Sequence, residues 1–551
     1  MPAITYKDFS GGLDRRLSIN VQEASRLWIL RNAYITLGKR IKKRPCIRRL
    51  NGDLNGSFGL EAISGRLKVF VDRGSIFSPP SDVDVIELDV PPWGDELDRI
   101  HYADIFSGFP FVVARYANGA VAHHYVDRSP TVVTITIASP GVVTWANHGF
   151  TAGREIKLST TGTLPTGLTA GTVYYVVSPM TNTFSLAATA GGSAINTTVG
   201  QSGVHTATAP TYISDTNNPR STAVTKAASR VFAIGTETVP YCAAGNPRDW
   251  TTSSDAGFLP ASLQQDTKSG PTAVGTFQDA LVVYFPEGAQ IWDVAVDPTA
   301  NAIRKRIYGV GTKWAQSLAS FASDLAFLSP FGVRSMTVAS QTDRIDDTDI
   351  GVPIDKLVTP DIATFENLTD PQEIFGVWVH QFGQYWLVMD AGGVSKVWAY
   401  TYSKSSKIAC WSEYTFTILI KGISTLDGKV YLRTGDELFE CDEDQFTDSG
   451  NLVSVEVQMA FQDAKTPGVL KQFYGADYVV EGSPEISFKY DPRDTGKESV
   501  SQLIPGDTRP GEFMPVEICA PAIAPVIRHA ADEAFEFSEM SLYFEALGLQ
   551  R

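Results

Sequence analysis

A cluster of carboxylates between residues 343 and 351 (DRIDDTDIG) is the first feature that could carry chemistry, because hard cations prefer carboxylate oxygens as ligands. Its spacing lacks the alternating oxygen ligands, the central glycine and the distal glutamate of a calcium loop. We therefore expect a solvated acidic loop rather than a cation site. Its carboxylates are Asp343, Asp346, Asp347 and Asp349.

Histidine and cysteine side chains are too scattered to suggest a metal site or an activated nucleophile. His123 and His124 are adjacent, but neighbours on a strand point to opposite faces and cannot bind one metal together. No GxSxG elbow, HExxH helix, P-loop or dinucleotide fingerprint is present. The sequence therefore predicts no metal, no cofactor and no enzymatic activity. The cysteines are at least 31 residues apart, as expected of thiols in a reducing cytosol: Cys46, Cys242, Cys410, Cys441 and Cys519.

A basic run from residue 39 to 49 is the strongest electrostatic feature. Seven cations occur in eleven residues without one acidic residue. Their repulsion can be relieved by water, by nucleic-acid phosphate or by an acidic protein surface. We expect docking against an acidic protein surface, with a solvated face and direct DNA contact as the alternatives. The residues are Lys39, Arg40, Lys42, Lys43, Arg44, Arg48 and Arg49.

Net charge separates this run from the rest of the chain. The 551 residues carry −15 overall, yet residues 1–50 hold 12 Lys and Arg against three Asp and Glu. The other 501 residues therefore carry −24. Such an acidic body argues against a protein that coats nucleic acid, because that role needs a positive face. No apolar stretch of 18 residues occurs, so neither membrane insertion nor secretion is expected.

A strand–turn–strand pattern recurs seven times and predicts the fold. Each copy has two alternating apolar runs joined by a glycine or polar turn, which is typical of an antiparallel hairpin with one buried face. Successive copies lie 44 to 60 residues apart, except for one interval of 120 that contains an insertion. This period predicts an all-β chain built on a β-propeller of about six to eight blades, with an evenly spaced β-sandwich as the alternative. The segments are 61–77, 104–126, 227–243, 274–294, 320–338, 378–402 and 422–442.

Composition and pattern divide the chain into five parts. The expected insertion is rich in Thr and Gly, and its only charged residues are Arg154, Glu155 and Lys157. The five parts are a basic arm with a helix (1–58), the first propeller blades (59–130), the inserted β-domain (131–209), the remaining blades (210–449) and a β-rich platform domain (450–551).

Two short helices are expected. Residues 20–34 have Asn20 as N-cap, Glu23 three residues on, and an apolar stripe of Ala24, Leu27 and Leu30. A second helix is expected near residues 354–362, interrupted by Pro360.

The N-terminal motif FSGGLDRRL (9–17), then LRNAY (30–34) and GKRIKKRPC (38–46), resembles the opening of tail nozzle proteins of short-tailed bacteriophages, also called tail tubular protein B. Cys46 stands where that family usually has glycine. Residues 147–206 are similar to a small β-module of phage virion proteins, and residues 463–491 to the platform segment after the propeller. The matching motif residues are Gly11, Gly12, Asn32, Gly38, Arg44 and Pro45.

The resemblance implies a structural virion protein, made in the host cytoplasm, that forms a ring of six copies at the distal end of the tail. Such a ring retains the genome and conducts DNA during ejection without sequence specificity. Its implied partners are further copies, the adaptor or gatekeeper ring, and tail fibres or spikes. Acidic walls suit such a conduit because they repel phosphate.

The alternative is a tail-associated propeller that acts on surface polysaccharide, either as a glycosidase or as a receptor-binding protein. The segment SSDAGFLP (253–260) has Ser253, Asp255 and Gly257 in the order that begins an Asp-box turn of glycosidase propellers. Leu259 and Pro260 stand where that motif has Thr-Trp. The carboxyl pair of a glycosidase cannot be located from sequence, since its separation is a three-dimensional property.

Overall fold

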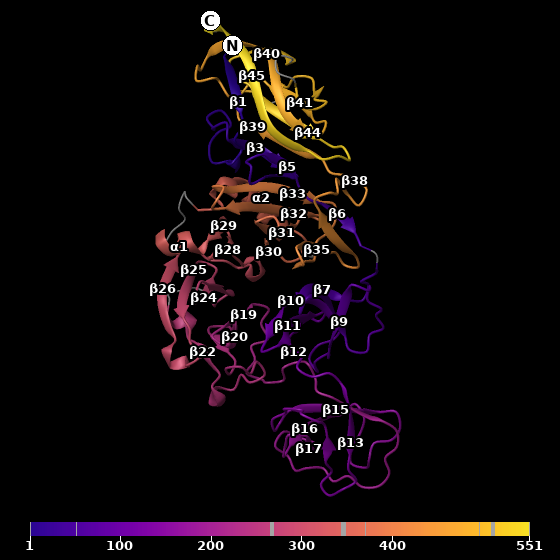
Figure 1. Ribbon diagram of the computed structural model, residues 1–551. Coiled ribbons are helices and arrows are strands. Elements are labelled where there is room, and N and C mark those ends of the chain that lie inside the picture. The colour runs from indigo at the N-terminus through magenta and orange to yellow at the C-terminus, as the bar shows by residue number, and fades with distance from the viewer. Residues whose placement is uncertain are drawn as a thin grey trace.

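The computed structural model describes residues 2–50, 52–264, 269–342, 349–369, 371–494, 496–508 and 513–549. Nearly all regular structure in these ranges is β. A propeller occupies the middle of the molecule, a platform of strands lies on one side of it and a small barrel lies on the other (Figure 1).

Six small sheets and the first four strands of a ten-stranded sheet make up the propeller; they are called blades 1 to 7 in chain order. Blade 1 consists of β7 (Phe58–Ile63), β8 (Arg66–Asp72) and β9 (Val83–Leu88). Blade 2 consists of β10 (Leu97–Phe106), β11 (Phe109–Tyr116) and β12 (Val121–Tyr125). Blade 3 consists of β19 (Val224–Ala227), β20 (Arg230–Ala233), β21 (Val239–Tyr241) and β22 (Gly257–Leu259). Blade 4 consists of β23 (Ala273–Phe277), β24 (Ala280–Phe285), β25 (Gly288–Asp293) and β26 (Ala302–Tyr308). Blade 5 consists of β27 (Ala319–Phe321), β28 (Asp324–Ser329) and β29 (Gly332–Ser335). Blade 6 consists of β30 (Phe375–Val379), β31 (Gln384–Asp390), β32 (Ser395–Ser403) and β33 (Ile408–Phe416). Blade 7 consists of β34 (Gly422–Leu426), β35 (Lys429–Arg433), β36 (Leu438–Asp442) and β6 (Cys46–Arg49).

Apolar cores between neighbouring blades close the seven blades into a ring. Phe70 and Val112 belong to the core that blades 1 and 2 share, and Leu67 and Leu438 to the core that blades 7 and 1 share. The other five junctions have shared cores of the same kind. Because each blade packs against both neighbours, the expected β-propeller is confirmed, and it has seven blades. Each of the seven hairpin segments found in the sequence falls in one blade.

Strand β6 closes the ring of blades. It precedes blade 1 in sequence but pairs antiparallel with β36, so that Arg49 lies opposite Phe439 and Cys46 opposite Asp442. The N-terminal segment therefore completes the last blade, and this holds the two ends of the propeller together.

Some blades depart from a regular four-stranded antiparallel sheet. In blade 1, β9 pairs parallel to β8. Blade 5 is followed by α1 (Met336–Thr342) and α2 (Asp355–Glu366), and α2 contains Pro360 as the sequence indicated. Buried Val358, Ile362 and Phe365 of α2 pack into the large core beneath the platform. Short 3-10 turns are η1 (Thr252–Ser254), η2 (Ala261–Gln264), η3 (Pro298–Ala300), η4 (Ala315–Ser317) and η5 (Val352–Ile354).

The platform is a two-sheet sandwich built from both ends of the chain. One sheet consists of β4 (Ala33–Ile35), β5 (Ile41–Lys43), β45 (Glu536–Leu549), β40 (Val469–Glu481) and β43 (Met514–Ala520), with β1 (Ala3–Tyr6) paired to β45. The other consists of β2 (Gly12–Leu13), β3 (Arg26–Arg31), β39 (Val455–Met459), β44 (Ala524–His529), β41 (Glu485–Lys489) and β42 (Gln502–Leu503), and it continues from β33 of blade 6 as one ten-stranded sheet. The short hairpin of β37 (Thr447–Asp448) and β38 (Asn451–Leu452) lies between blade 7 and the platform in sequence. This shared sheet is the structural link between propeller and platform.

The helix expected over residues 20–34 is wrong, because β3 and β4 occupy its second half. A register shift between Leu27 and Ile29 in the pairing of β3 with β39 puts one extra residue into the strand. Leu27 and Leu30 therefore both face the core three residues apart, a spacing that imitates a helix.

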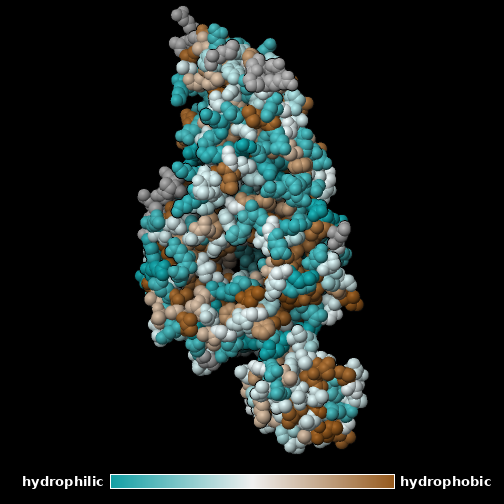
Figure 2. All heavy atoms as spheres, viewed as in Figure 1, coloured by the Kyte–Doolittle hydropathy of each residue, from teal (hydrophilic) through white to brown (hydrophobic). Residues whose placement is uncertain are grey.

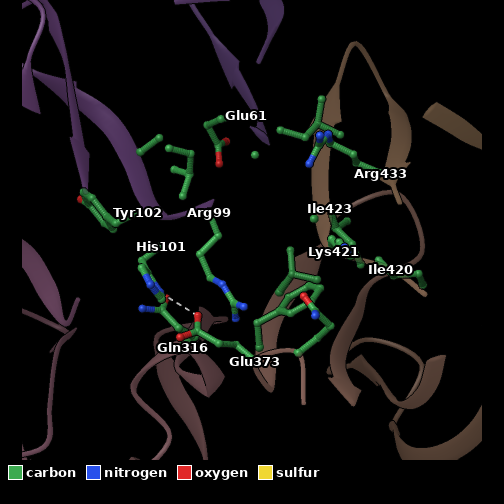
Figure 3. A pocket seen from close by; sticks show the side chains of 18 of the residues that line it. Glu61, Arg99, His101, Tyr102, Gln316, Glu373, Ile420, Lys421, Ile423 and Arg433 are labelled. Carbon is green, nitrogen blue, oxygen red and sulfur yellow. Dashed lines mark hydrogen bonds and ion pairs between the residues drawn. The ribbon is translucent and has the colours of Figure 1, made fainter. Parts of the chain in front are cut away.

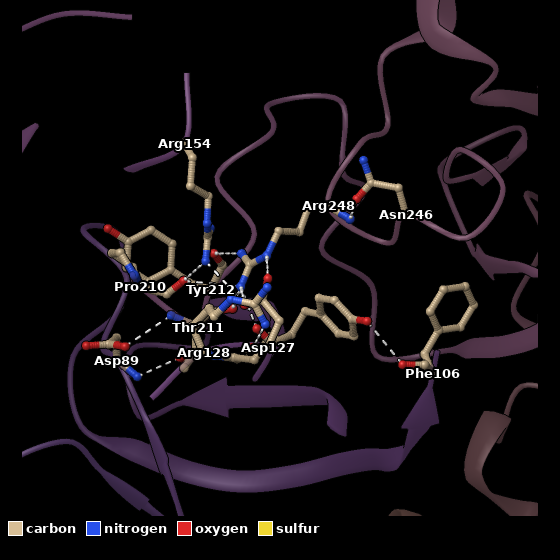
Figure 4. Close-up of polar contacts among 12 residues, drawn as sticks. Asp89, Phe106, Asp127, Arg128, Arg154, Pro210, Thr211, Tyr212, Asn246 and Arg248 are labelled. Atoms are coloured by element: carbon tan, nitrogen blue, oxygen red, sulfur yellow. Dashed lines mark hydrogen bonds and ion pairs between the residues drawn. The ribbon is translucent and has the colours of Figure 1, made fainter. Parts of the chain in front are cut away.

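The insertion after β12 is a closed barrel of six strands with its own apolar core. A charged cluster attaches it to blade 3 (Figure 4). Arg154 of the barrel lies 3.4 Å from Asp127, and Arg248 of blade 3 lies 2.7 Å from the same carboxylate. The barrel strands are β13 (Thr131–Ile135), β14 (Val143–Thr144), β15 (Glu155–Thr160), β16 (Val173–Val177), β17 (Thr183–Ala187) and β18 (His205–Thr208).

Neither described α-helix is long and apolar enough to cross a membrane.

Candidate functional site

A cavity of about 500 Å³ lies at the centre of the propeller, where the space-filling view is hollowed (Figure 2). Its wall comes from the first strands of blades 1, 2, 6 and 7 (β7, β10, β30 and β34) together with the η4 segment before blade 5. Each of these strands is an edge strand of its blade, and β7 contacts both β10 and β34 of the neighbouring blades. Segments far apart in sequence therefore place their side chains around one space.

Glu61 of β7 is the carboxyl group of this cavity with the most perturbed acidity. Its Oε1 accepts hydrogen bonds from the Ala62 amide (3.2 Å) and from the Ser424 hydroxyl of blade 7 (3.4 Å). Burial outweighs these two bonds and raises the pKa of Glu61 to about 7. The group can therefore hold a proton near neutral pH and release it to a partner.

A histidine–glutamate pair lies on another part of the wall (Figure 3). His101 Nδ1 of β10 is 2.7 Å from Glu373 Oε2, in the segment that enters blade 6. The imidazole is buried, and its Nε2 has no hydrogen-bond partner among the described residues. The contact fixes the orientation of the Glu373 carboxylate, whose side chain is 37% exposed.

Three cationic side chains line the same space. Arg99 extends into the middle of the cavity, with Nε 3.1 Å from Asp98 (Figure 3). Lys421 is exposed, and no hydrogen bond or ion pair of its ammonium occurs within the described ranges. Arg433 is buried and donates to the Ser57 and Gly435 carbonyls, and its burial lowers its pKa to about 10. Arg99 and Lys421 are thus available to an incoming ligand, whereas Arg433 supports the wall.

This arrangement can bind and protonate a polar ligand rich in hydroxyl groups. Gln316 and Gln372 add amide groups, and Phe70, Tyr102 and Phe375 add aromatic surface. No group of three His, Cys, Asp or Glu residues close enough to hold a metal occurs in the searched part of the chain. The carboxyl, imidazole and amide groups of the cavity can transfer protons and form hydrogen bonds.

The basic run lies at the joint between platform and propeller, and acidic residues of the same chain accompany it. Arg44 is 1% exposed, so its predicted role as a docking residue is wrong: it serves the interior of its own chain. Lys43 is also buried, with Nζ 3.0 Å from the Ala531 carbonyl. For the other five residues, docking to a second protein stays a prediction. Their ion pairs are Lys39–Asp8 (2.7 Å), Arg40–Glu536 (2.7 Å), Lys42–Glu443 (3.2 Å), Arg48–Glu440 (3.0 Å) and Arg49–Glu437 (2.9 Å).

Most of the N-terminal motif residues meet at this joint. Asn32, with φ +53°, accepts from Arg44 Nε (3.2 Å) and from the Thr415 amide of β33 (2.8 Å), and it donates to the Ser454 carbonyl (2.8 Å). Gly12 has φ +51°, and a Cβ there would lie 2.5 Å from the Cβ of Cys410 in β33.

The other motif positions differ in how tightly they are packed. A Cβ on Gly11 would lie 2.8 Å from the Ser25 carbonyl oxygen. Gly38 has no such close neighbour, and the Pro45 carbonyl accepts from Arg44 Nη1 (3.0 Å). The structure thus gives Gly11, Gly12, Asn32 and Pro45 contacts at or beside the joint, and Gly38 no steric role.

The remaining sequence candidates are structural or undescribed. His123 and His124 are buried, and His124 contacts the Tyr116 hydroxyl at 2.9 Å. Asp255 pairs with Arg230 at 2.9 Å at the end of η1. Asp349 is buried rather than solvated, because it accepts from the Ser335 (3.0 Å) and Ile350 (2.7 Å) amides, and burial raises its pKa to about 6. Outside the described residues lie Asp343, Asp346 and Asp347.

The cavity residues themselves were missed by motif analysis. Glu61, Arg99, His101, Glu373 and Lys421 come from four blades, so no local spacing connects them. One signal was available: the first strand of each hairpin unit carries polar residues, and some of these line the centre of the ring.

Comparisons with known proteins return solved structures but no family model and no curated protein. The exo-β-1,3-galactanase of Phanerochaete chrysosporium with galactose is 10% identical, over 58% of this chain and 95% of that one, with a TM-score of 0.20. The Dos1 propeller is 8% identical, over 73% and 95%, with a TM-score of 0.29. A glycoside hydrolase family 43 arabinoxylan arabinofuranohydrolase of Bacillus subtilis is 8% identical, over 80% and 95%, with a TM-score of 0.18. Such low values say nothing of what this chain acts on, and the propeller is established by its own seven blades.

The expectation that the chain is not an enzyme does not stand: it rested only on missing motifs, and glycoside hydrolases are among the matched structures. The missing motif misled the prediction for a physical reason. Carboxyl groups that converge at the centre of a propeller come from different blades, as Glu61 and Glu373 do here, and no short sequence pattern marks them.

Proposed function

We propose that this chain binds a surface polysaccharide in the central cavity and hydrolyses its glycosidic bonds. The observation that supports this most is Glu61, a cavity carboxyl group whose pKa is raised to about 7. A general acid is most effective when its pKa lies near the working pH.

The proposed reaction needs two carboxyl groups with different roles. Glu61 transfers its proton to the glycosidic oxygen as the bond from that oxygen to the anomeric carbon breaks. Water attacks the anomeric carbon, and Glu373, oriented by His101, takes the proton of that water. Exchange with solvent restores both groups. Arg99, Lys421 and Gln316 bind sugar hydroxyls.

The test is the release of reducing ends from bacterial surface polysaccharides. Glu61→Gln and Glu373→Gln should each lower the rate at least about 100-fold, the usual contribution of acid–base catalysis. Glu96→Gln, at an exposed position outside the cavity, is the matched control and should leave the rate unchanged. If no polysaccharide is cleaved or bound by the wild type, the proposal fails.

A second candidate function is that of a nozzle ring at the end of a short phage tail. The specific observation in its favour is that Gly12, Asn32 and Arg44 of the family motif make close contacts at one joint between platform and propeller. In this proposal further copies form a ring that DNA crosses without sequence specificity, an adaptor ring binds on one side, and the inserted barrel contacts fibres or spikes.

Negative-stain microscopy of the purified protein and of virions tests the ring. Six-fold rings on the tail, labelled by an antibody against this chain, are the expected result. A chain that remains monomeric at every concentration and is absent from virions would contradict it.

A further inference from the structure

Arg220 lines an open groove of about 810 Å³ on the propeller, separate from the central cavity. The groove lies between the segment that enters blade 3 and the turn joining β20 to β21. Four of its eleven wall residues carry hydroxyl groups, and Glu237 adds a carboxylate; the four are Ser221, Thr222, Thr236 and Thr238.

The Arg220 guanidinium stacks on the Trp93 ring, with Cζ 3.5 Å from the ring centroid. Within the described ranges it makes no hydrogen bond and no ion pair, and its Nε is buried. Of the five N–H donors of a guanidinium, the one on Nε is therefore buried without a partner, which is costly. Burial lowers the pKa of Arg220, and no ion pair of its guanidinium occurs among the described residues, although Glu237 lines the same groove.

The backbone holds this arginine in a conformation that side chains rarely adopt. Its φ is +49°, in the left-handed region. Buried Asn218 fixes that conformation: its Oδ1 accepts from the Arg220 amide (2.9 Å), and its Nδ2 contacts His123 Nδ1 (2.9 Å). A strained residue with dedicated buried support is typical of a functional position.

The groove is next to the central cavity. Gln316, which lines the cavity, donates from Nε2 to the carbonyl of Thr222, which lines the groove (3.2 Å). The cavity and the groove therefore lie on either side of one hydrogen-bonded pair of residues.

We propose that the Arg220 groove binds a uronic acid residue of a polysaccharide whose chain continues from the central cavity. This inference rests on the function proposed above and narrows its substrate to an acidic polysaccharide. The two oxygens of a carboxylate match the fork of a guanidinium, and stacking on Trp93 leaves the edge of the fork free. Sugar hydroxyls are matched by the threonine and serine hydroxyls around it.

Isothermal titration calorimetry with three probes tests this assignment. The probes are a galacturonic acid trimer, a neutral galactose trimer and inorganic phosphate. The wild type should bind the acidic trimer at least about 10-fold more tightly than the neutral one, and R220Q should lose that preference because a charge-assisted hydrogen bond is removed. R304Q, which removes an exposed arginine of β26, should bind like the wild type.

The outcomes separate the two proposals. Equal binding of both trimers, or an unchanged preference in R220Q, overturns the uronate site while leaving the polysaccharide function standing. Binding of phosphate without the acidic trimer also overturns it. Failure of every trimer to bind, while a surface polysaccharide is still cleaved, overturns the uronate site alone; failure of both assays removes both proposals. R220K keeps the positive charge but lacks the forked donors of the guanidinium, so it should weaken binding of the acidic trimer. This variant keeps the test decisive even if R220Q fails to fold.

Discussion

Replacing Arg44 by methionine should destabilise the joint between platform and propeller far more than replacing a neighbouring surface arginine. Arg44 is 1% exposed and Asp448 4% exposed, and Arg44 Nη1 lies 3.1 Å from Asp448 Oδ1. The guanidinium also donates to Asn32 and to the Thr415 carbonyl (2.9 Å), and it lies 4.0 Å from the Phe416 ring centroid. Arg44→Met leaves the Asp448 carboxylate buried without its cation.

The expected loss is about 3 kcal/mol of unfolding free energy, the lower end of the about 3–5 kcal/mol for breaking a buried ion pair. The lower end applies because Asp448 keeps one hydrogen bond, from the Ile47 amide (3.1 Å). The matched control is Arg48→Met, whose pair with Glu440 is half exposed on the arginine side and should contribute less than about 1 kcal/mol.

Urea denaturation followed by tryptophan fluorescence measures both variants. Adding Asp448→Asn to Arg44→Met should recover part of the loss, because the stranded charge is then removed. The reasoning is refuted if Arg44→Met costs less than about 1 kcal/mol, or if Arg48→Met costs as much.

Three further predictions concern the cavity and the barrel. Because burial raises the pKa of Glu61 from 4.5 to about 7, its contribution to stability is present below pH 4.5 and is lost as pH rises through 7. The free energy of unfolding of Glu61→Gln, obtained from thermal melts, should therefore equal that of the wild type near pH 4 and exceed it by up to about 3 kcal/mol at pH 8. Equal free energies of unfolding at pH 8 would contradict this. Burial alone would raise the pKa of Asp127, but Arg248 and Arg154 hold that pKa below its usual value. Asp127→Asn removes this interaction and should loosen the attachment of the barrel, which faster proteolysis near residues 127–130 would reveal. An unchanged cleavage rate would contradict the role of the cluster as an anchor. Deleting residues 131–209 should leave a folded propeller by circular dichroism, since paired β13 and β18 bring the ends of the insertion together; loss of the folded signal would contradict a separable barrel.

The propeller could be predicted because its signal is local. Each blade is a hairpin whose buried face alternates with period two, as in β24 (Ala280–Phe285) beside β25 (Gly288–Asp293), and the repeat length is visible along the chain. The blade count needed the shared cores, since a repeat length alone fits several ring sizes.

The joint and the cavity depend on long-range pairing that local patterns do not contain. Arg44 looks like part of an exposed basic run until Asp448, some 400 residues later, is placed beside it. The irregular strand β3 imitates helical spacing because of one extra residue. Glu61, His101 and Glu373 become neighbours only when the ring closes.

The most direct test of the central claim is a crystal structure of Glu61→Gln soaked with an oligosaccharide derived from a surface polysaccharide. If the active site is the central cavity, the sugar should lie there, with its glycosidic oxygen within hydrogen-bond distance of residue 61 and its anomeric carbon facing Glu373. An oligosaccharide bound elsewhere, with the cavity holding only water, would contradict the account.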